Sequence, residues 1–323
     1  MTWLSIESWE VSGFSSPTKV QRLNNHVFRV GSLGNPKVLS SYLIIDEKIA
    51  LVDCGPRSVI EELLSLVKEC GVVPSEVDAL LLTHIHLDHA GGAGTFLERC
   101  SKAKVFIPER GYKHLLNPEA LNSSARPILG ERIFANWGAC DPVPRERALS
   151  VKAHEKIRLG SIELEYLPAP GHAPHHNVLH DADRSVIFSA DALGIYDRET
   201  QSIIPTTPPP SFDLNQAILD IRMIEELQPQ LVCLAHFAEI YPEEDFYDRV
   251  VSIFSGWAEI VSSYVKQKNL LAYEFKSYLD VFSLLTERWP EYQELSEDLK
   301  EQVSRVDVGG LLNYFIRTKR YSS

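Results

Sequence analysis

The sequence predicts an α/β fold in which strands and helices alternate, followed by an all-helical C-terminal part. Three features support this prediction. Short apolar, β-branched runs alternate with helical patterns up to about residue 240. One buried-type strand, residues 77–82, ends in an unusually dense group of histidines and one aspartate. From Glu243 onward apolar residues recur at helical spacing, for example Phe246, Val250 and Phe254, a pattern typical of core-facing helices.

The first third of the chain contains the clearest strand patterns. In chain order we expect strands at residues 26–30, 42–45 and 49–52, a helix at 59–67 that ends at Gly71, and a strand at 77–82. The second and third strands are separated only by three polar residues, which favours a hairpin. Asp53 directly follows that hairpin and is a candidate N-cap or turn residue for the helix that follows.

The segment after residue 82 carries the chemistry. It reads Thr83-His84-Ile85-His86-Leu87-Asp88-His89 and ends in two glycines, after which a helix is expected. Neutral imidazole and carboxylate are ligands that Zn²⁺, Mn²⁺ and Fe²⁺ accept. In an extended segment residues two apart point the same way, so His84 and His86 can share one metal, while Asp88 and His89 aim at a second position. The competing interpretation is a solvated turn that is rich in histidine.

The middle of the chain breaks and then resumes the α/β rhythm. A strand at 104–108 is followed by a proline-interrupted insertion at 109–147, which either forms a pocket wall or packs only on its own domain. Strands at 157–167 and 178–190, a proline-rich loop at 203–210, a helix at 213–227 and a strand at 231–234 follow. Tyr196 and Phe212 either line a pocket beside that loop or serve in packing. His114 and His154 are expected at the surface or in the core, and His180 in a polar loop.

Composition excludes several classes of protein. Hydrophobic residues make up 44% and charged residues 24% of the 323 positions, as in ordinary globular proteins. A formal net charge of −12 disfavours a nucleic-acid surface. The five cysteines contain no CxxC pair, so we expect neither a disulfide framework nor a thiolate zinc site, and a cytoplasmic location is the natural expectation. Neither a secretion signal nor a run of eighteen apolar residues is visible, so no membrane partner is expected.

His84-Ile85-His86-Leu87-Asp88-His89 resembles the HxHxDH motif of the metallo-β-lactamase-fold hydrolases. Three later segments resemble the remaining metal loops of that family: Pro170-Gly171-His172, Ser189-Ala190-Asp191 and Ala235-His236. The resemblance covers residues 18–240 and implies an αββα sandwich at 1–240 as the catalytic domain. Residues 241–323 would then be a helical extension that covers the active site.

The resemblance also implies a ligand set, and it implies that Asp53 supports the metal loop by hydrogen bonding, a role that an N-cap or turn position does not exclude. His84, His86 and His172 would hold one metal; Asp88, His89 and His236 would hold the other; and Asp191 would bridge them. His172 takes the ligand position because it follows Pro170-Gly171, which leaves His175 and His176 as supporting or substrate-facing residues. The expected cofactors are two divalent metal ions, with zinc the first choice and iron or manganese compatible with the same donors.

The function implied is hydrolysis of a small-molecule thioester, ester or lactone by a hydroxide that bridges the metals. Asp88 and Asp191 are the expected catalytic carboxylates, since either can carry the proton. Three alternatives stay open at this stage: a mononuclear iron persulfide oxygenase, a phosphodiesterase, and a metal-binding sensor with little turnover. The sequence does not predict the oligomeric state.

Overall fold

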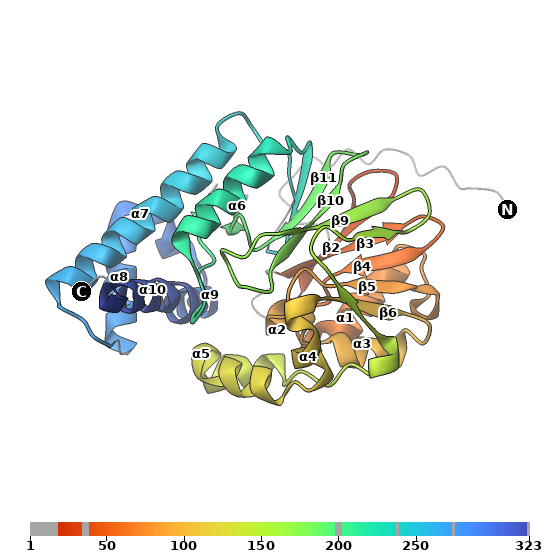
Figure 1. Cartoon of the computed structure of the whole chain (residues 1–323), viewed down its shortest axis with the longest axis horizontal. Coiled ribbons are helices and arrows are strands. Elements are labelled where there is room, and N and C mark those ends of the chain that lie inside the picture. The colour runs from red at the N-terminus through yellow and green to blue at the C-terminus, as the bar shows by residue number, and fades with distance from the viewer. Residues whose placement is uncertain (1–18, 34–38, 198–201, 237–238, 273–274, 322–323) are drawn as a thin grey trace.

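Two β-sheets stack face to face with helices on their outer faces in the computed structural model, which describes residues 19–33, 39–197, 202–236, 239–272 and 275–321 (Figure 1). A group of further helices from the C-terminal part lies at one end of this sandwich. The α/β sandwich with C-terminal helices predicted from the sequence is therefore confirmed.

Among the described residues the first sheet has seven strands, which lie side by side in chain order. They are β1 (Val20–Arg22), β2 (Val27–Leu33), β3 (Leu39–Ile45), β4 (Ile49–Val52), β5 (Ala79–Leu81), β6 (Lys104–Pro108) and β7 (Ala148–Val151). Strands β1 to β4 are antiparallel, and the β3–β4 hairpin is the one that the polar residues at 46–48 predict. Strands β4 to β7 are parallel, so helices must carry the chain back between them.

The second sheet has six strands within the described ranges, in the order β15-β14-β11-β10-β9-β8. Its members, with a separate two-stranded pair β12–β13, are β8 (Lys156–Arg158), β9 (Glu163–Pro168), β10 (Asn177–Asp181), β11 (Val186–Ala190), β12 (Ile195–Tyr196), β13 (Ile203–Ile204), β14 (Leu231–Leu234) and β15 (Glu239–Ile240). Side chains from the facing sides of the two sheets fill the space between them. Tyr42 of β3 and Phe188 of β11, for example, meet edge to face with ring centroids 5.5 Å apart.

Helices cover the outer faces and the connections of the sandwich. Those before the C-terminal part are η1 (Arg57–Val59), α1 (Ile60–Glu69), η2 (Pro74–Glu76), α2 (Leu87–Ala90), α3 (Ala93–Arg99), α4 (Glu109–Leu116), α5 (Glu119–Trp137), η3 (Arg145–Arg147) and α6 (Leu214–Glu226). Asp213 begins α6 by accepting a hydrogen bond from the backbone N–H of Gln216. Within α5 the helix is interrupted at Gly130, whose φ of 79° is a left-handed conformation that favours glycine.

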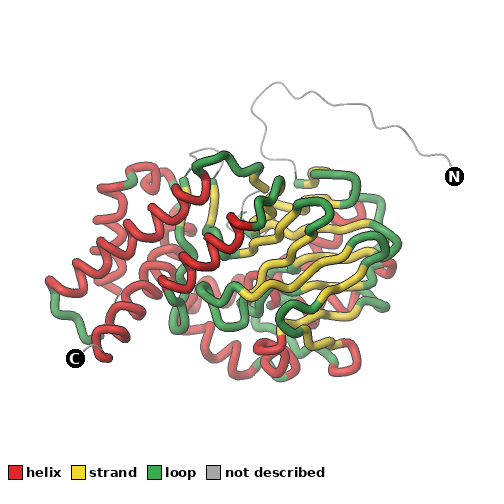
Figure 2. Tube along the Cα trace, turned by 45° about the horizontal axis from the view of Figure 1, so that its top comes forward, coloured by secondary structure: helices red, strands yellow, loops and turns green. Residues whose placement is uncertain are grey.

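The C-terminal part, from residue 246 onward, consists of helices joined by loops in its described residues (Figure 2). It comprises α7 (Phe246–Gln267), α8 (Phe275–Arg288), η4 (Pro290–Glu294), α9 (Glu297–Gln302), the π-helix η5 (Val303–Val308) and α10 (Gly309–Tyr321). The stripe Phe246, Val250, Phe254, Trp257 of α7 is buried, as its spacing predicts. Tyr292 accepts a hydrogen bond from Trp257 Nε1 (3.2 Å) and donates one to the carbonyl of Ile203 (2.6 Å), which ties these helices to β13. None of the described helices is both long and apolar enough to cross a membrane.

Several strands of both sheets end at the same edge of the sandwich. β4 and β5 of the first sheet are parallel, and β11 and β14 of the second sheet are parallel as well. The loops that follow these strands, together with the loop after β9, carry the polar residues singled out from the sequence. This edge is therefore where the sequence motifs meet.

Candidate metal centre

The seven residues named from the sequence motifs come together at this edge from four separate loops. His84, His86, Asp88 and His89 follow β5, His172 follows β9, Asp191 follows β11 and His236 follows β14. Their donor atoms form two groups whose members lie within 4.8 Å of one another: His84, His86, His172 and Asp191 in one, and Asp88, His89 and His236 in the other. These groups are the division expected from the sequence, with segments about 150 residues apart meeting in space.

Three imidazole nitrogens face one another in the first group. His84 Nε2 lies 3.1 Å from His86 Nδ1, and His172 Nε2 lies 3.0 Å from the same atom. Four donors placed tetrahedrally around Zn²⁺, each about 2.0 to 2.1 Å from the ion, would be separated by roughly 3.3 Å. The spacing of the three nitrogens is therefore close to what one such ion requires.

Asp191 lies between the two groups. Its Oδ2 is 3.2 Å from His172 Nε2 and 3.3 Å from His89 Nε2, while its Oδ1 is 3.2 Å from His236 Nε2. Asp88 Oδ2 completes the second group at 3.8 Å from His89 Nε2 and 3.7 Å from His236 Nε2. One carboxylate thus faces both groups at once, which is the geometry of a bridging ligand.

Asp53 orients two of the histidines from behind. Its Oδ2 accepts hydrogen bonds from His89 Nδ1 (2.9 Å) and from Thr83 Oγ1 (2.7 Å), and its Oδ1 accepts one from the backbone N–H of Thr83 (2.8 Å). Because Thr83 Oγ1 gives its proton to Asp53, it accepts one from His84 Nδ1 at 3.1 Å. Both imidazoles therefore donate from Nδ1 and turn Nε2 toward the centre of the site. The helix-capping alternative for Asp53 is wrong, since Pro56 precedes η1 without a side-chain cap.

His172 and His176 are fixed by carbonyl groups in the same manner. His172 Nδ1 donates to the carbonyl of Thr206 at 3.1 Å, which leaves Nε2 free for the site. His176 Nδ1 donates to the carbonyl of Ala169, and its Nε2 accepts the backbone N–H of Asp191 at 3.3 Å. Both nitrogens of His176 are thus used in holding the loop that carries Asp191, so His176 supports the site from outside it.

Burial and charge set the protonation of these groups. Burial lowers the pKa of His84 and His86 well below the usual value and that of His172 to about 3, so all three are neutral and able to donate a lone pair. Burial also acts to lower the pKa of His89, but the carboxylates of Asp191 and Asp88 outweigh it and raise that pKa well above its usual range. The second group therefore favours a positive charge.

The residues of this site fit divalent cations. His84 Nδ1 donates to Thr83 Oγ1 and His172 Nδ1 donates to the carbonyl of Thr206. The Nε2 atoms of both rings therefore carry lone pairs, and both face Nδ1 of His86. His89 Nε2 and Asp191 Oδ1 are buried and make no hydrogen bond among the described residues. Converging lone pairs and buried carboxylates are costly unless a cation lies between them. The cluster thus suggests bound divalent metal ions.

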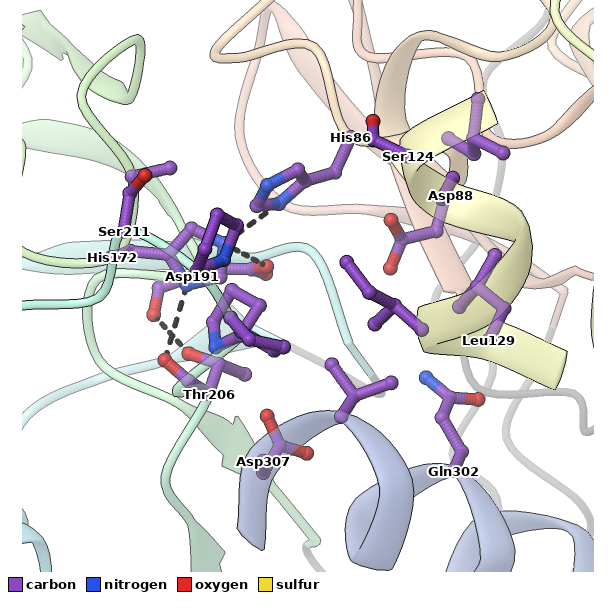
Figure 3. Close-up of a pocket in the computed structure, with 18 of the residues that line it drawn as sticks. His86, Asp88, Ser124, Leu129, His172, Asp191, Thr206, Ser211, Gln302 and Asp307 are labelled. Carbon is purple, nitrogen blue, oxygen red and sulfur yellow. Dashed lines mark hydrogen bonds and ion pairs between the residues drawn. The ribbon is translucent and has the colours of Figure 1, made fainter. Parts of the chain in front are cut away.

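A cavity of about 250 Å³ opens from this cluster (Figure 3). His86, Asp88, His172, Asp191 and His236 line it at the metal-site end. Three parts of the chain form its walls. Helix α5 contributes Leu121, Ser124, Ala125, Ile128, Leu129 and Trp137; the proline-rich loop contributes Thr206, Pro208, Pro209, Pro210 and Ser211; and the C-terminal helices contribute Gln302, Val306 and Asp307. The insertion at 109–147 therefore supplies a pocket wall.

Other residues considered from the sequence lie elsewhere. His175 lines the cavity, with its ring centroid 5.1 Å from that of His86, and it does not join either donor group. His114 and His154 are exposed. Tyr196 packs edge to face on Phe246 and Phe212 is buried against Tyr314, so both serve in packing.

Sequence reasoning missed several residues around the site. Thr83 and Thr206 lie next to predicted site segments, but nothing in their type distinguishes them from ordinary loop threonines. Gln302 and Asp307 lie in a helical stretch of mixed composition, where no motif marks them. The Gly309-Gly310 pair that follows is the only local signal, because adjacent glycines inside a helix often indicate a close backbone approach.

The chain resembles known proteins over most of its length. Residues 34–236 match the family model of the metallo-beta-lactamase superfamily. Metallo-beta-lactamase fold-containing protein ST1585 of Sulfurisphaera tokodaii is 30% identical over 224 residues, which are 68% of this chain and 80% of that protein. Rubredoxin-oxygen oxidoreductase of Megalodesulfovibrio gigas is 32% identical over 174 residues, 52% of this chain and 36% of that protein. The crystal structure of the metallo-beta-lactamase family protein TTHA1429 from Thermus thermophilus superposes with a TM-score of 0.68 at 18% identity, covering 92% of this chain and 95% of that one.

Proposed function

Because this chain belongs to the metallo-beta-lactamase superfamily, we propose that it is a metal-dependent hydrolase that cleaves a small ester, thioester or lactone. The observation that carries the proposal is the convergence of two groups of donor atoms on either side of Asp191. In this proposal His84, His86 and His172 hold one divalent ion, and Asp88, His89 and His236 hold the other.

Two bound cations would supply an activated water at neutral pH and would stabilise negative charge on the oxygen of the scissile carbonyl. Zinc is the first choice of metal because five of the seven donors are imidazole nitrogens, although iron and manganese accept the same groups.

The protein groups have separate tasks. Asp88 and Asp191 line the cavity, so their carboxylates are placed to accept the proton of the attacking water and to return it to the leaving group. Asp53, Thr83 and Thr206 hold the imidazole rings in the required tautomers. The proline-rich loop and the apolar side chains of α5 keep bulk water from the reacting atoms, which strengthens electrostatic interactions in the cavity.

A second candidate is an oxidoreductase, because the chain is similar to rubredoxin-oxygen oxidoreductase over about half its length. This candidate includes the mononuclear iron persulfide oxygenase. Such an oxygenase needs fewer than seven donors, so the convergence of all seven supports the hydrolase instead. For a phosphodiesterase, the formal net charge of −12 is unfavourable, since a polyanionic substrate would be repelled.

The test is an activity screen with metal analysis on the same sample. Purified protein is assayed against a panel of esters, thioesters, lactones and phosphodiesters, with oxygen uptake measured in parallel, and His86→Ala serves as the control. We expect hydrolysis of one carboxylic substrate class that depends on His86 and on two equivalents of metal. Oxygen consumption with iron in the protein would support the oxidoreductase, and rates no higher than those of His86→Ala would support a metal-binding sensor.

A further inference from the structure

We propose that Gln302 and Asp307 form a specificity site in the cavity wall made by the C-terminal helices and bind an uncharged hydrogen-bonding group, a hydroxyl or an amide, in the non-reacting part of the substrate. Both residues belong to the C-terminal helices and both line the cavity (Figure 3). The inference rests on the proposed function, because it concerns which substrate reaches the metal centre.

The helix type brings these two residues to one face. In an α-helix, with 3.6 residues per turn, a separation of five residues would turn the second side chain by about 140° from the first. Residues 303–308 are instead a π-helix, whose hydrogen bonds close five residues apart, so Gln302, Val306 and Asp307 all face the cavity. The local change of helix type therefore places a carboxamide and a carboxyl group in the same wall of the cavity.

Both groups have hydrogen-bonding capacity that the protein does not use. Gln302 is only 8% exposed, yet its amide makes no hydrogen bond to any described residue. Asp307 is 4% exposed, and its Oδ1 accepts the backbone N–H of Thr207 at 2.9 Å while its Oδ2 has no partner within the described ranges. Both residues line the cavity, so a ligand that enters it can pair with these unused polar atoms in place of water.

The position of Asp307 is fixed by its neighbours rather than by the ligand. Its backbone carbonyl accepts a hydrogen bond from Thr207 Oγ1 at 2.6 Å, in addition to the contact at Oδ1. Gly310 allows this approach, because a Cβ atom there would lie 1.5 Å from the carbonyl oxygen of Thr207. The start of α10 is thus pressed against the proline-rich loop, and Oδ2 of Asp307 is held at the cavity before any substrate enters.

The charge at this wall favours an uncharged group. Burial raises the pKa of Asp307 well above its usual range, which favours the neutral carboxyl group. A neutral carboxyl group donates from Oδ2, and the amide of Gln302 both donates and accepts, which matches a hydroxyl or an amide. An anionic group here would lose its hydration without gaining a charged partner from Gln302 or Asp307.

The cavity wall formed by α5 is mostly apolar. Leu121, Ala125 and Leu129 belong to it, and Ser124 is its polar residue. A substrate with its scissile carbonyl at the metal centre would place an aliphatic segment against these side chains and its polar group at Gln302 and Asp307. The substrate class inferred is an uncharged ester, thioester or lactone with an aliphatic chain that carries a hydroxyl or amide.

Hydroxamates test this inference without turnover, because a hydroxamate chelates the bound metal whether or not the protein is a hydrolase. Aliphatic hydroxamates of increasing chain length, ending in methyl, hydroxymethyl or carboxylate, are titrated into the metal-loaded protein by calorimetry. At the best chain length we expect the hydroxyl-ended ligand to bind about five- to tenfold more tightly than the methyl-ended one. The carboxylate-ended ligand should bind least well.

Variants separate recognition from structure. Gln302→Leu removes the amide without touching Thr207, and Asp307→Ala removes the carboxyl group; each should reduce the hydroxyl preference to about twofold or less. Asp307→Asn keeps an oxygen for the N–H of Thr207 and places an NH₂ donor at the position of Oδ2, so it should keep the preference. Asp298→Asn is the matched control, because Asp298 lies on α9 outside the cavity and pairs with Arg132. It should keep the full preference. Gln302→Lys should reverse the ranking so that the carboxylate-ended ligand binds best.

The inference is overturned if wild-type protein shows no preference for the hydroxyl, if it prefers the carboxylate, or if the preference survives in both Gln302→Leu and Asp307→Ala. Thermal unfolding of each variant identifies one that fails to fold, and the other variant then decides. A hydroxamate ranking as expected, combined with no hydrolysis in the substrate panel, would refute the proposed function and leave the specificity site standing. Hydrolysis of a panel substrate without the expected hydroxamate ranking would support the proposed function and refute the specificity site.

Discussion

Replacing Asp53 by asparagine tests how the fold orients the donor histidines. Asp53 is 4% exposed, and its Oδ2 accepts from both His89 Nδ1 and Thr83 Oγ1. Its Oδ1 accepts the backbone N–H of Thr83, so an asparagine must keep its oxygen there and place its NH₂ at the position of Oδ2. The substitution therefore places an NH₂ donor where His89 Nδ1 and Thr83 Oγ1 both need an acceptor.

The consequence follows from the tautomers. His89 can pair with the new NH₂ only by moving its proton from Nδ1 to Nε2, which removes the lone pair that faces Asp191. The hydroxyl of Thr83 would likewise turn its proton toward His84 Nδ1, so both metal positions are weakened. Loss of such supporting contacts typically reduces metal affinity by about 10- to 100-fold, or about 1.4 to 2.7 kcal/mol.

The assay is competition for zinc against a chromophoric chelator, at fixed pH, for wild-type protein and Asp53→Asn. Asp181→Asn is the matched control: Asp181 is 3% exposed, pairs with Arg184 and lies at the end of β10 away from the site. Circular dichroism of the metal-free proteins checks that each variant folds. If Asp53→Asn binds both metals with wild-type affinity, the role assigned to this hydrogen-bond network is wrong.

Three further predictions concern stability. Burial raises the pKa of Asp220 from 3.8 to about 6, so the folded state binds more protons than the unfolded state between these values. The free energy of unfolding of the metal-free protein should therefore fall by roughly 2 to 3 kcal/mol as pH rises through this window. In urea denaturation at a series of pH values, Asp220→Asn should lack this fall. His176→Ala leaves the buried N–H of Asp191 without its acceptor, so it should cost about 1 to 3 kcal/mol in urea unfolding and weaken zinc retention; unchanged retention would contradict its supporting role. Gly310→Ala should lower the melting temperature far more than Gly309→Ala. A Cβ at Gly310 would lie 1.5 Å from a backbone oxygen, whereas a Cβ at Gly309 would lie 3.2 Å from the nearest atom, a ring carbon. Equal shifts in melting temperature would contradict the close packing at Gly310.

The sequence was informative wherever one short motif fixes both identity and position. His84, His86, Asp88 and His89 lie within six residues, so their proximity required no knowledge of the fold. His172 and Asp191 needed the family resemblance, because 83 residues separate His172 from His89 and spacing alone cannot show that they meet. The strands and the stripe on α7 followed from periodicity, since one face of each element is buried.

The residues that the sequence did not reveal act through tertiary contacts. Thr83 matters because Asp53, thirty residues earlier, accepts its proton. Gln302 and Asp307 reach the cavity only because a π-helix replaces the α-helix there, and α-helical periodicity would place them on different faces. The aromatic residues Tyr196 and Phe212 illustrate the reverse case, since each is close to the proline-rich loop in sequence but packs into the core.

Anomalous diffraction at the zinc edge, from crystals of the protein loaded with zinc, shows whether these seven side chains hold two metal ions. We expect two peaks: one among the side chains of His84, His86 and His172, the other among those of Asp88, His89 and His236, with Asp191 between them. A single peak, or a peak that these seven residues do not surround, would contradict this expectation.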